Sequence, residues 1–308
     1  MSGVKTVKIK PEDDGIRLNR WFLREYPSLS LSRLQKLLRT KQIKVDGKRA
    51  ETSTRLESGQ ELRIPPLDNE KAVKKENIVS NKDADFILST VIYKDDNIIA
   101  LNKPSGLAVQ GGTNTSKHID GMLEALKFEN SEKPKLVHRI DKDTSGVLLL
   151  ARNRKFADIL TKAFREHTLQ KTYLALVRGC PDKLEGIINL PLEKVGERMQ
   201  AVKGGQKAVT EYKVLDKAAK KYALLEAKPL TGRTHQIRAH LEAIGTPILG
   251  DDKYFGKNRL RLQEIADKLY LHSYKIDLSN IYNKKTEIKA DLPKHFAEAC
   301  EFLGLETE

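Results

Sequence analysis

Cysteine is scarce in this 308-residue sequence, and the two present, Cys180 and Cys300, stand far apart. They have no CxxC spacing, so they predict neither a four-thiolate site nor a disulfide framework, and they favour a reducing compartment. No apolar run approaches the roughly 20 residues needed to span a bilayer. The N-terminal MSGVKTVKIKPEDDG also lacks the apolar segment of a secretory signal. These absences predict a cytoplasmic protein that does not bind membranes.

Cofactor motifs are absent as well. The sequence has no P-loop and no GxGxxG turn. His235 and His240 are separated by five positions, so they do not share a helix face as the histidines of HExxH do. We therefore expect no metal site and no small-molecule cofactor.

Acidic residues are outnumbered, because 56 Lys and Arg against 42 Asp and Glu leave a net charge of +14. Residues 1–50 hold 13 basic and 5 acidic residues, so 13 − 5 = +8 of this excess lies there. Such an excess points to a polyanionic partner, most often nucleic acid. A basic solubility tail is the alternative, but this segment carries core-type apolar residues at regular spacing.

Residues 15–64 have the pattern of a compact module. The apolar spacing in GIRLNRWFLREY predicts one helix, and SLSLSRLQKLLRTKQ predicts a second, capped by Ser30 or Ser32. A hairpin is expected at Asp46-Gly47, and ELRIPP predicts a final short strand. Two helices and a hairpin would form a small platform with Lys and Arg on its exposed side.

This module resembles an S4 RNA-binding domain, chiefly through SRLQKLLRTKQIKVDGKRA (32–50). The resemblance implies an RNA-binding domain over 15–66, whose contacts with phosphates would be electrostatic and would position the RNA. The alternative is that these charges are only the solvated face of a small domain. The candidate RNA contacts are Arg17, Arg20, Arg33, Lys36 and Lys44.

The stretch after Pro65-Pro66 is polar and lacks apolar periodicity, so 67–85 is predicted to be a linker. From Phe86 onward the pattern is that of a mixed α/β domain. Strands are expected at 91–93, 98–101, 146–151, 173–178, 222–227 and 270–278, and helices at 117–128, 154–166 and 234–244.

The densest polar cluster is HRIDKDTSG (138–146), which precedes a predicted buried strand, VLLLA (147–151). Charged side chains in half-buried segments need partners or a function. Arg139 and Asp141 are therefore either an ordinary salt bridge that locks a loop or part of a site. On an extended segment the two would share a face.

A second cluster is LTGRTHQIRAHLEAIGTPILGD (230–251). Thr234 is a plausible cap of the predicted helix, and Gly245 fits the position just after its end. Arg233 lies just before the helix start, where a structural cation is electrostatically unfavourable. It is expected to bind a carboxylate or a phosphate.

Together these stretches resemble the large-subunit ribosomal RNA pseudouridine synthase family, across residues 86–300. His138 and the run 234–236 favour this branch over the small-subunit one, and Ile140 departs from the usual Leu. The resemblance implies an α+β fold, with the S4 domain followed at 86–304 by a catalytic domain built on a mixed, largely antiparallel β-sheet flanked by helices. The matching segments are 103–107, 138–146, 171–179, 207–212, 230–241 and 249–251.

The family breaks the uracil N1–C1′ bond and rejoins the base through C5, without a cofactor. The resemblance implies that Asp141 is the catalytic carboxylate, Arg233 its charge partner and Tyr173 the ring that packs on the base. It assigns Arg139 to evicting the base from its stack. Asp141 attacks C1′, attacks C6 or takes a proton from C2′, and the sequence does not choose among these routes.

Other assignments stay open at the level of sequence. Lys103 and Lys171 are phosphate contacts or ordinary surface lysines, and Tyr173 alternatively packs in the core. The rival functions are a non-catalytic ribosome-assembly factor and an N-glycosidase with Asp143 as its second acid. The expected partner is large-subunit ribosomal RNA, with tRNA as the alternative substrate, and a monomer is the default.

Overall fold

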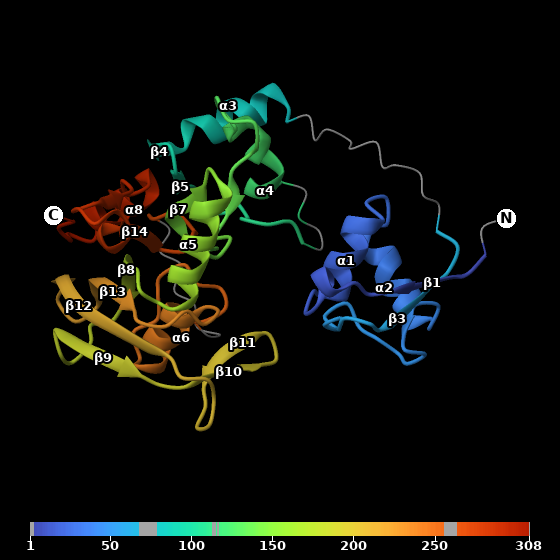
Figure 1. Ribbon diagram of the computed structural model, residues 1–308. Coiled ribbons are helices and arrows are strands. Elements are labelled where there is room, and N and C mark those ends of the chain that lie inside the picture. The colour runs from blue at the N-terminus through green and yellow to red at the C-terminus, as the bar shows by residue number, and fades with distance from the viewer. Residues whose placement is uncertain (1–2, 68–78, 113–114, 116, 256–263, 308) are drawn as a thin grey trace. The chain divides into compact units, whose positions relative to one another are not determined.

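The chain divides into two compact units, Met1–Glu76 and Asn77–Glu308 (Figure 1). The predicted domain limits, 15–66 and 86–304, remain predictions, and most of the predicted linker lies outside the described residues. No helix in the part of the chain that is described is long and apolar enough to cross a membrane. The computed structural model describes residues 3–67, 79–112, 115, 117–255 and 264–307.

The first unit packs two helices and a three-stranded antiparallel sheet, order β1-β3-β2, around one core. Leu18, Trp21 and Phe22 are buried in it, as the helical spacing predicted. The Ser30 hydroxyl accepts a hydrogen bond from the Arg33 N–H at 3.2 Å, so Ser30 is the cap. The elements are β1 (Lys5–Lys8), η1 (Pro11–Asp13), α1 (Leu18–Glu25), α2 (Leu31–Arg39), β2 (Lys44–Val45) and β3 (Glu61–Ile64).

The predicted hairpin is realised only as a tight turn. Val45 and Lys48 exchange backbone hydrogen bonds around Asp46 and Gly47, which both have positive φ. Such angles fit the two-residue turns of hairpins. The strand that pairs with β2 along its length is β3, which lies farther along the chain.

The second unit is built on a ten-stranded sheet, whose path is β4-β5-β7-β14-β8-β13-β12-β9, with β15 beside β14 and β6 beside β7. Only β7 and β14 pair in parallel among the described strands. This confirms the expected mixed, largely antiparallel sheet. Its strands are β4 (Val91–Lys94), β5 (Ile98–Lys103), β6 (Lys135–Leu136), β7 (Ser145–Ala151), β8 (Gln170–Arg178), β9 (Glu185–Asn189), β12 (Val209–Ala218), β13 (Tyr222–Pro229), β14 (Leu271–Asp277) and β15 (Glu287–Lys289).

Helices cover both faces of the β5–β7 part of the sheet, because alternate residues of a strand point to opposite faces. Val147 and Leu149 of β7 pack with α5 (Arg154–Arg165). Leu148 and Leu150 pack on the other side with α3 (Asn81–Ser89), α4 (Ile119–Met122) and η2 (Leu123–Leu126).

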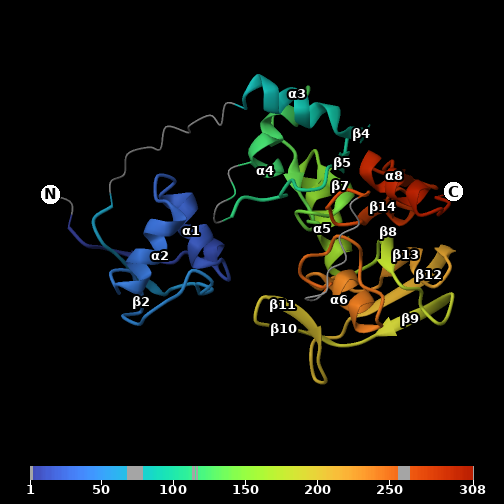
Figure 2. The same cartoon turned by 180° about the vertical axis from the view of Figure 1, so that it is seen from behind.

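The other half of the sheet packs against α6 (Gln236–Ala243) and α8 (Lys294–Phe302). Both views show α8 beside β14 (Figures 1 and 2). A separate two-stranded ribbon, β10 (Leu192–Val195) with β11 (Arg198–Ala201), lies near α6. A short helix, α7 (Ser279–Tyr282), follows β14.

Several elements differ from the sequence prediction. The end of the predicted linker is helical, since α3 begins at Asn81 with Ser80 as its cap and buries Ile87. The helix expected at 117–128 is a short α-turn followed by a 3-10 turn, α4 and η2. The helix expected from 234 begins at Gln236, and the strands β9 to β12 were not predicted. The alternation of apolar and polar residues is weak in these strands. β9 and β12 lie toward the edge of the large sheet, and β10 and β11 form the separate ribbon, so few of their side chains enter the core.

Candidate active site

The segment that carries Asp141 runs from β6 to β7 and is held by His138. The His138 Nε2 accepts a hydrogen bond from the Leu149 N–H at 2.8 Å, and its ring stacks on Phe164 with 4.0 Å between ring centroids. Burial lowers the pKa of His138 to about 3, with the charge of Lys171 adding to the effect. His138 is therefore a neutral acceptor that ties the segment to β7.

Lys103 also holds this segment, through a hydrogen bond to the Lys142 carbonyl. Its buried position is a correction to the predicted role as a phosphate contact. Its side chain is fully buried, and Nζ donates to the carbonyls of Pro104, Leu107 and Lys142 at 2.8 to 2.9 Å. Burial lowers the pKa of Lys103 to about 7. An ammonium group that is surrounded by three carbonyls organises loops and does not face RNA.

The end of the segment is positioned by the parallel contact between β7 and β14. Gly146 has a φ of 104°, and a Cβ at this position would lie 2.2 Å from the Ser273 carbonyl oxygen. Beside it, the Ser145 hydroxyl and the His272 Nδ1 are 2.9 Å apart. Glycine is required here because the two backbones approach too closely for a side chain.

Asp141 pairs with Arg238, not with Arg233 as the resemblance had implied. The Arg238 Nη1 lies 3.2 Å from the Asp141 Oδ2. Arg233 lies in the loop before α6, and its Nε donates to the Lys207 carbonyl at 3.1 Å. The correction follows from geometry, because Arg238 is buried in α6 and reaches the carboxylate.

Arg238 is itself fixed by Asp251, which is fully buried at the end of the LGD motif. The Arg238 Nε and Nη2 donate to the two Asp251 oxygens at 2.7 and 2.8 Å. Burial opposes the charge of Arg238, but the hydrogen bonds and charges of Asp251 and Asp141 raise its pKa overall. A bidentate pair of this kind sets the orientation of the guanidinium as well as its charge.

His235 is the second group near Asp141. It has a left-handed backbone, φ 50°, and its Nε2 lies 3.7 Å from the Asp141 Oδ2. The Tyr254 hydroxyl accepts from the Met199 N–H and lies 3.0 Å from the His235 Nδ1. Because the Tyr254 proton is then available to Nδ1, we infer that neutral His235 carries its proton on Nε2, toward Asp141. Burial lowers the pKa of His235; Asp141 opposes this and Arg238 adds to it.

Thr234 does not cap the helix. The N-cap residue is His235, which makes no capping hydrogen bond, and the Gln236 side chain accepts from the Arg233 N–H at 3.0 Å and from the Thr231 hydroxyl at 2.6 Å. The predicted helix end is confirmed, since Gly245 has a positive φ and follows Ile244. Residues 233–235 thereby form a loop at the pocket.

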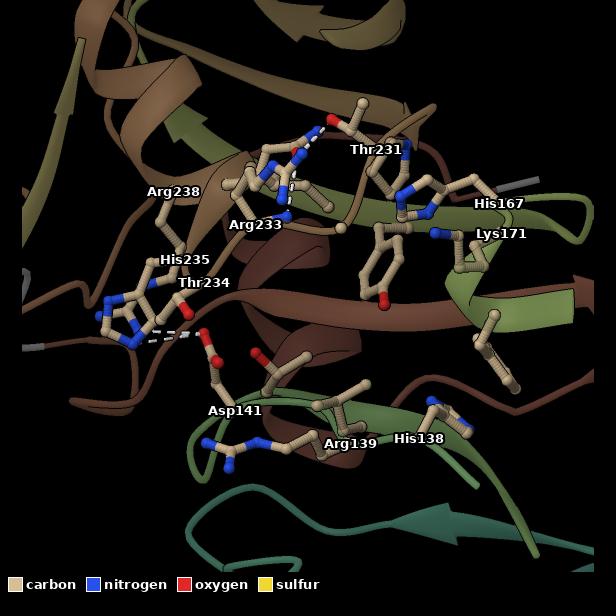
Figure 3. A pocket seen from close by; sticks show the side chains of 18 of the residues that line it. His138, Arg139, Asp141, His167, Lys171, Thr231, Arg233, Thr234, His235 and Arg238 are labelled. Atoms are coloured by element: carbon tan, nitrogen blue, oxygen red, sulfur yellow. Dashed lines mark hydrogen bonds and ion pairs between the residues drawn. The ribbon is translucent and has the colours of Figure 1, made fainter. Parts of the chain in front are cut away.

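Asp141, Arg238 and the loop 231–235 line a cavity of about 740 Å³ (Figure 3). Asp141 and Arg139 lie on one side of it, Tyr173 and Lys171 come from β8, and Arg233 comes from the loop before α6. Burial raises the pKa of Tyr173 to about 12, so it is a neutral phenol. The structure thus places four of the predicted residues in one cavity with Asp141, although Arg233 is not its ion-pair partner.

A second cavity, of about 790 Å³, shares Arg139, Asp141, His235 and Arg238 with the first. Asp143 lines only this second cavity. Among the described residues, no group of three or more His, Cys, Asp or Glu side chains is arranged to hold a metal ion.

The predicted contacts of the first unit lie on its surface. Arg17, Arg20, Arg33 and Lys36 are exposed, and Lys44 is half-buried on β2. Arg24 follows the same spacing but forms an ion pair with the buried Asp13 at 2.6 Å.

Sequence reasoning missed the role of Arg238 and of its partner Asp251. A signal was present, because Arg238 lies between the core positions Ile237 and Leu241 on an otherwise apolar stripe. A buried arginine needs a carboxylate, and the LGD motif offered one.

The chain is similar to known proteins over most of its length. The family model for RNA pseudouridylate synthase matches residues 97–243. The "Ribosomal large subunit pseudouridine synthase C" of Rickettsia bellii is 38% identical over 91% of this chain and 95% of its own length. The protein of the same name in Vibrio cholerae is 35% identical over 96% of both chains. "RNA pseudouridine synthase 4, mitochondrial" of Arabidopsis thaliana is 36% identical over 94% of this chain and 77% of its own length.

A solved structure described as the human RNA pseudouridylate synthase domain containing 4 has a TM-score of 0.62 to this chain, at 29% identity. The matched region comprises 73% of this chain and 96% of the human chain. The fold and the relatives define an enzyme that acts on RNA. The chain belongs to the RNA pseudouridylate synthase family, whose members are isomerases that convert uridine to pseudouridine.

Proposed function

We propose that this protein isomerises specific uridines of large-subunit ribosomal RNA, with Asp141 as the catalytic carboxylate. The observation that carries the proposal is the ion pair between Asp141 and Arg238 inside a cavity wide enough for a nucleotide. The choice of RNA is supported by the relatives in Rickettsia and Vibrio, which are named for the large ribosomal subunit. The reaction requires no cofactor and is assigned to a cytoplasmic monomer.

The geometry also favours a particular atom of Asp141. The contacts from the Arg238 guanidinium and from the neutral His235 ring both go to Oδ2. Oδ1 is therefore the oxygen that approaches the nucleotide without first breaking an ion pair. Attack at C1′, attack at C6 and proton removal from C2′ are all compatible with this arrangement. Whichever route is taken, Arg238 orients the carboxylate and places a positive charge beside it.

Two further residues have roles around the base. Tyr173 is proposed to pack on the uracil ring, since its phenol lines the cavity and remains uncharged. Arg139 is exposed and lines both cavities, and it is proposed to replace the target base in its stack. Eviction costs a few kcal/mol and is easiest in loops and bulges.

The first unit is proposed to bind RNA as an S4-type domain. Its support is the excess of basic residues in 1–50 and the exposure of Arg17, Arg20, Arg33 and Lys36. These side chains would contact phosphates and set the position of the RNA without reading its sequence.

The N-glycosidase alternative receives less support. Glycosidases of the two-carboxylate type need an acid on each side of the bond. Among the described residues that line the 740 Å³ cavity, Asp141 is the only carboxylate. A glycosidase would release free uracil, whereas isomerisation leaves the mass of the RNA unchanged.

The test is to map pseudouridines across the ribosomal RNA of cells that lack this gene, complemented by the intact gene or by Asp141→Asn. We expect specific large-subunit sites to disappear and only the intact gene to restore them. Purified Asp141→Asn should bind RNA nearly as well but lose at least about a thousandfold in turnover. If the variant restored the sites, Asp141 would not be the catalytic group; if no site changed, tRNA would be the next substrate.

A further inference from the structure

The cavity is lined by more positively charged side chains than a neutral uracil base and one carboxylate would require. The single carboxylate, Asp141, is already neutralised by Arg238, which is also paired with Asp251. Arg139, Lys171 and Arg233 line the cavity as well, and none of them has an ion pair among the described residues. Uracil and ribose are neutral, so these cations match another part of the substrate.

Two of these cations and a histidine gather at the end of the cavity away from Asp141. We call His167, Lys171 and Arg233 the cationic end. Figure 3 shows His167 beside Lys171, on the opposite side of the pocket from Asp141 and Arg139. His167 follows α5 and has a left-handed backbone, φ 57°. Three separate segments therefore contribute one basic group each.

The backbone is shaped so that these groups can meet. A Cβ on Gly232 would lie 3.1 Å from the His167 Cε1, so the turn before Arg233 passes close to the imidazole and a side chain there would make the approach tight. The Arg233 Nε is held by the Lys207 carbonyl, which orients the guanidinium without neutralising it. The backbone therefore holds Arg233 in a fixed orientation, and the neutral carbonyl that binds it does not balance its positive charge.

The electrostatics of the cationic end are unfavourable in the free protein. Burial lowers the pKa of Lys171. Burial lowers the pKa of His167 too, and the charges of Lys171 and Arg233 lower it further. Within the described chain, no carboxylate of the cavity faces them. A half-buried ammonium group without a partner costs stability, unless an anion arrives with the substrate.

We propose that the cationic end is a subsite for one phosphodiester group of the RNA, next to the uridine whose base enters the cavity. This inference rests on the proposed function, because it takes RNA as the substrate. A phosphate has the right charge and offers several oxygens, so Lys171, Arg233 and His167 can each donate to it. The subsite holds the strand at one end of the cavity while Asp141 acts at the other.

The test uses the full-length protein and a 23S ribosomal RNA transcript labelled with tritium at C5 of uridine, since isomerisation releases that hydrogen. Lys171→Met and Arg233→Gln keep much of the side-chain volume but remove the charge. We expect each variant to raise KM roughly tenfold, to change KM more than kcat, and to flatten the salt dependence of binding. Lys289→Met, at an exposed lysine of β15 outside both cavities, is the matched control.

Stability provides an independent readout. If Lys171 binds a phosphate only when RNA is present, Lys171→Met should leave the melting temperature of the free protein unchanged or raise it. The reason is that the substitution removes a half-buried charge that has no ion pair among the described residues. A lower melting temperature together with an unchanged KM would overturn the subsite and make Lys171 a structural residue.

The phosphate itself is located with short RNA substrates that carry a neutral methylphosphonate at one position next to the target uridine. One position should weaken binding to the intact protein but cause no further loss in Lys171→Met or Arg233→Gln. Additive losses at every position would refute the subsite. If the intact protein released no tritium from the transcript, the proposed function would fail instead, and the two failures are thereby distinguished.

Discussion

At the scale of the residue, the site depends on which arginine reaches Asp141. Arg238 lies between two carboxylates, with Asp251 holding two of its nitrogens and Asp141 a third. Its side chain is only 7% exposed, so its charge could not be satisfied by water. Arg233, five positions earlier, contacts no carboxylate in the part of the chain that is described, and its Nε donates to the Lys207 carbonyl.

Replacing Arg238 therefore tests both stability and catalysis. Arg238→Met leaves the fully buried Asp251 without its counter-charge, which should cost about 3–5 kcal/mol of unfolding free energy. Arg233→Gln should cost little, because it removes no ion pair among the described residues. Urea unfolding of the two variants checks this, and equal losses would mean that Arg233 is structural after all.

A pH-dependent contribution to stability is expected from His138. Its pKa is about 3 in the folded protein against 6.5 in the unfolded chain, so only the unfolded state takes up this proton between those values. The free energy of unfolding should therefore fall as the pH drops from 6.5 toward 3. In His138→Gln this fall should be shallower by up to about 1.4 kcal/mol per pH unit. Chemical unfolding at several pH values measures the difference; identical slopes would show that His138 is protonated in the fold.

At the scale of the element, the parallel junction of β7 and β14 positions the segment that carries Asp141. The two strands pair at Ser145 with His272 and at Gly146 with Ser273. Lys103 and His138 then tie the preceding loop to the β5–β7 part of the sheet. The carboxylate is thus held by main-chain geometry on one side and by the buried Lys103 and the half-buried His138 on the other.

Gly146→Ala should break this junction. The new Cβ would collide with the Ser273 carbonyl, and the positive φ adds strain, so we expect a loss of at least about 3 kcal/mol. Gly196→Ala is the control, because Gly196 also has a positive φ but has nothing within 4 Å of the added Cβ. It should lose only about 1–2 kcal/mol. Thermal unfolding compares the two variants. A similar loss of stability in both would show that the close approach of Gly146 to the Ser273 carbonyl does not determine the effect.

At the scale of the whole molecule, charge is concentrated in the first unit and chemistry in the second. Residues 1–50 carry 13 basic residues, whereas the groups around Asp141 come from 138–141, β8 and 231–238. Binding and isomerisation are therefore expected to respond to different substitutions.

Charge removal on the first unit should weaken RNA binding without altering the catalytic step. Replacing Arg20, Arg33 and Lys36 by Gln in the full-length chain should lower the salt slope of binding by roughly 2 to 3. The control replaces Lys213, Lys217 and Lys289, which are exposed on the second unit. Binding measured from 50 to 200 mM salt checks the slope. An unchanged slope would remove the first unit from RNA binding.

The sequence by itself determined the elements with strong apolar periodicity, the motif segment around Asp141 and the family to which they belong. Local spacing suffices there, because a helix or strand buries its own stripe whatever lies opposite. Tertiary structure alone decided that Arg238 pairs with Asp141, that Lys103 is buried among carbonyls and that Arg233 has a carbonyl rather than a carboxylate as its partner among the described residues. The reason is physical: several cations of equal charge compete for one carboxylate, and the outcome depends on which of them the packed α6 and its neighbours bring within reach.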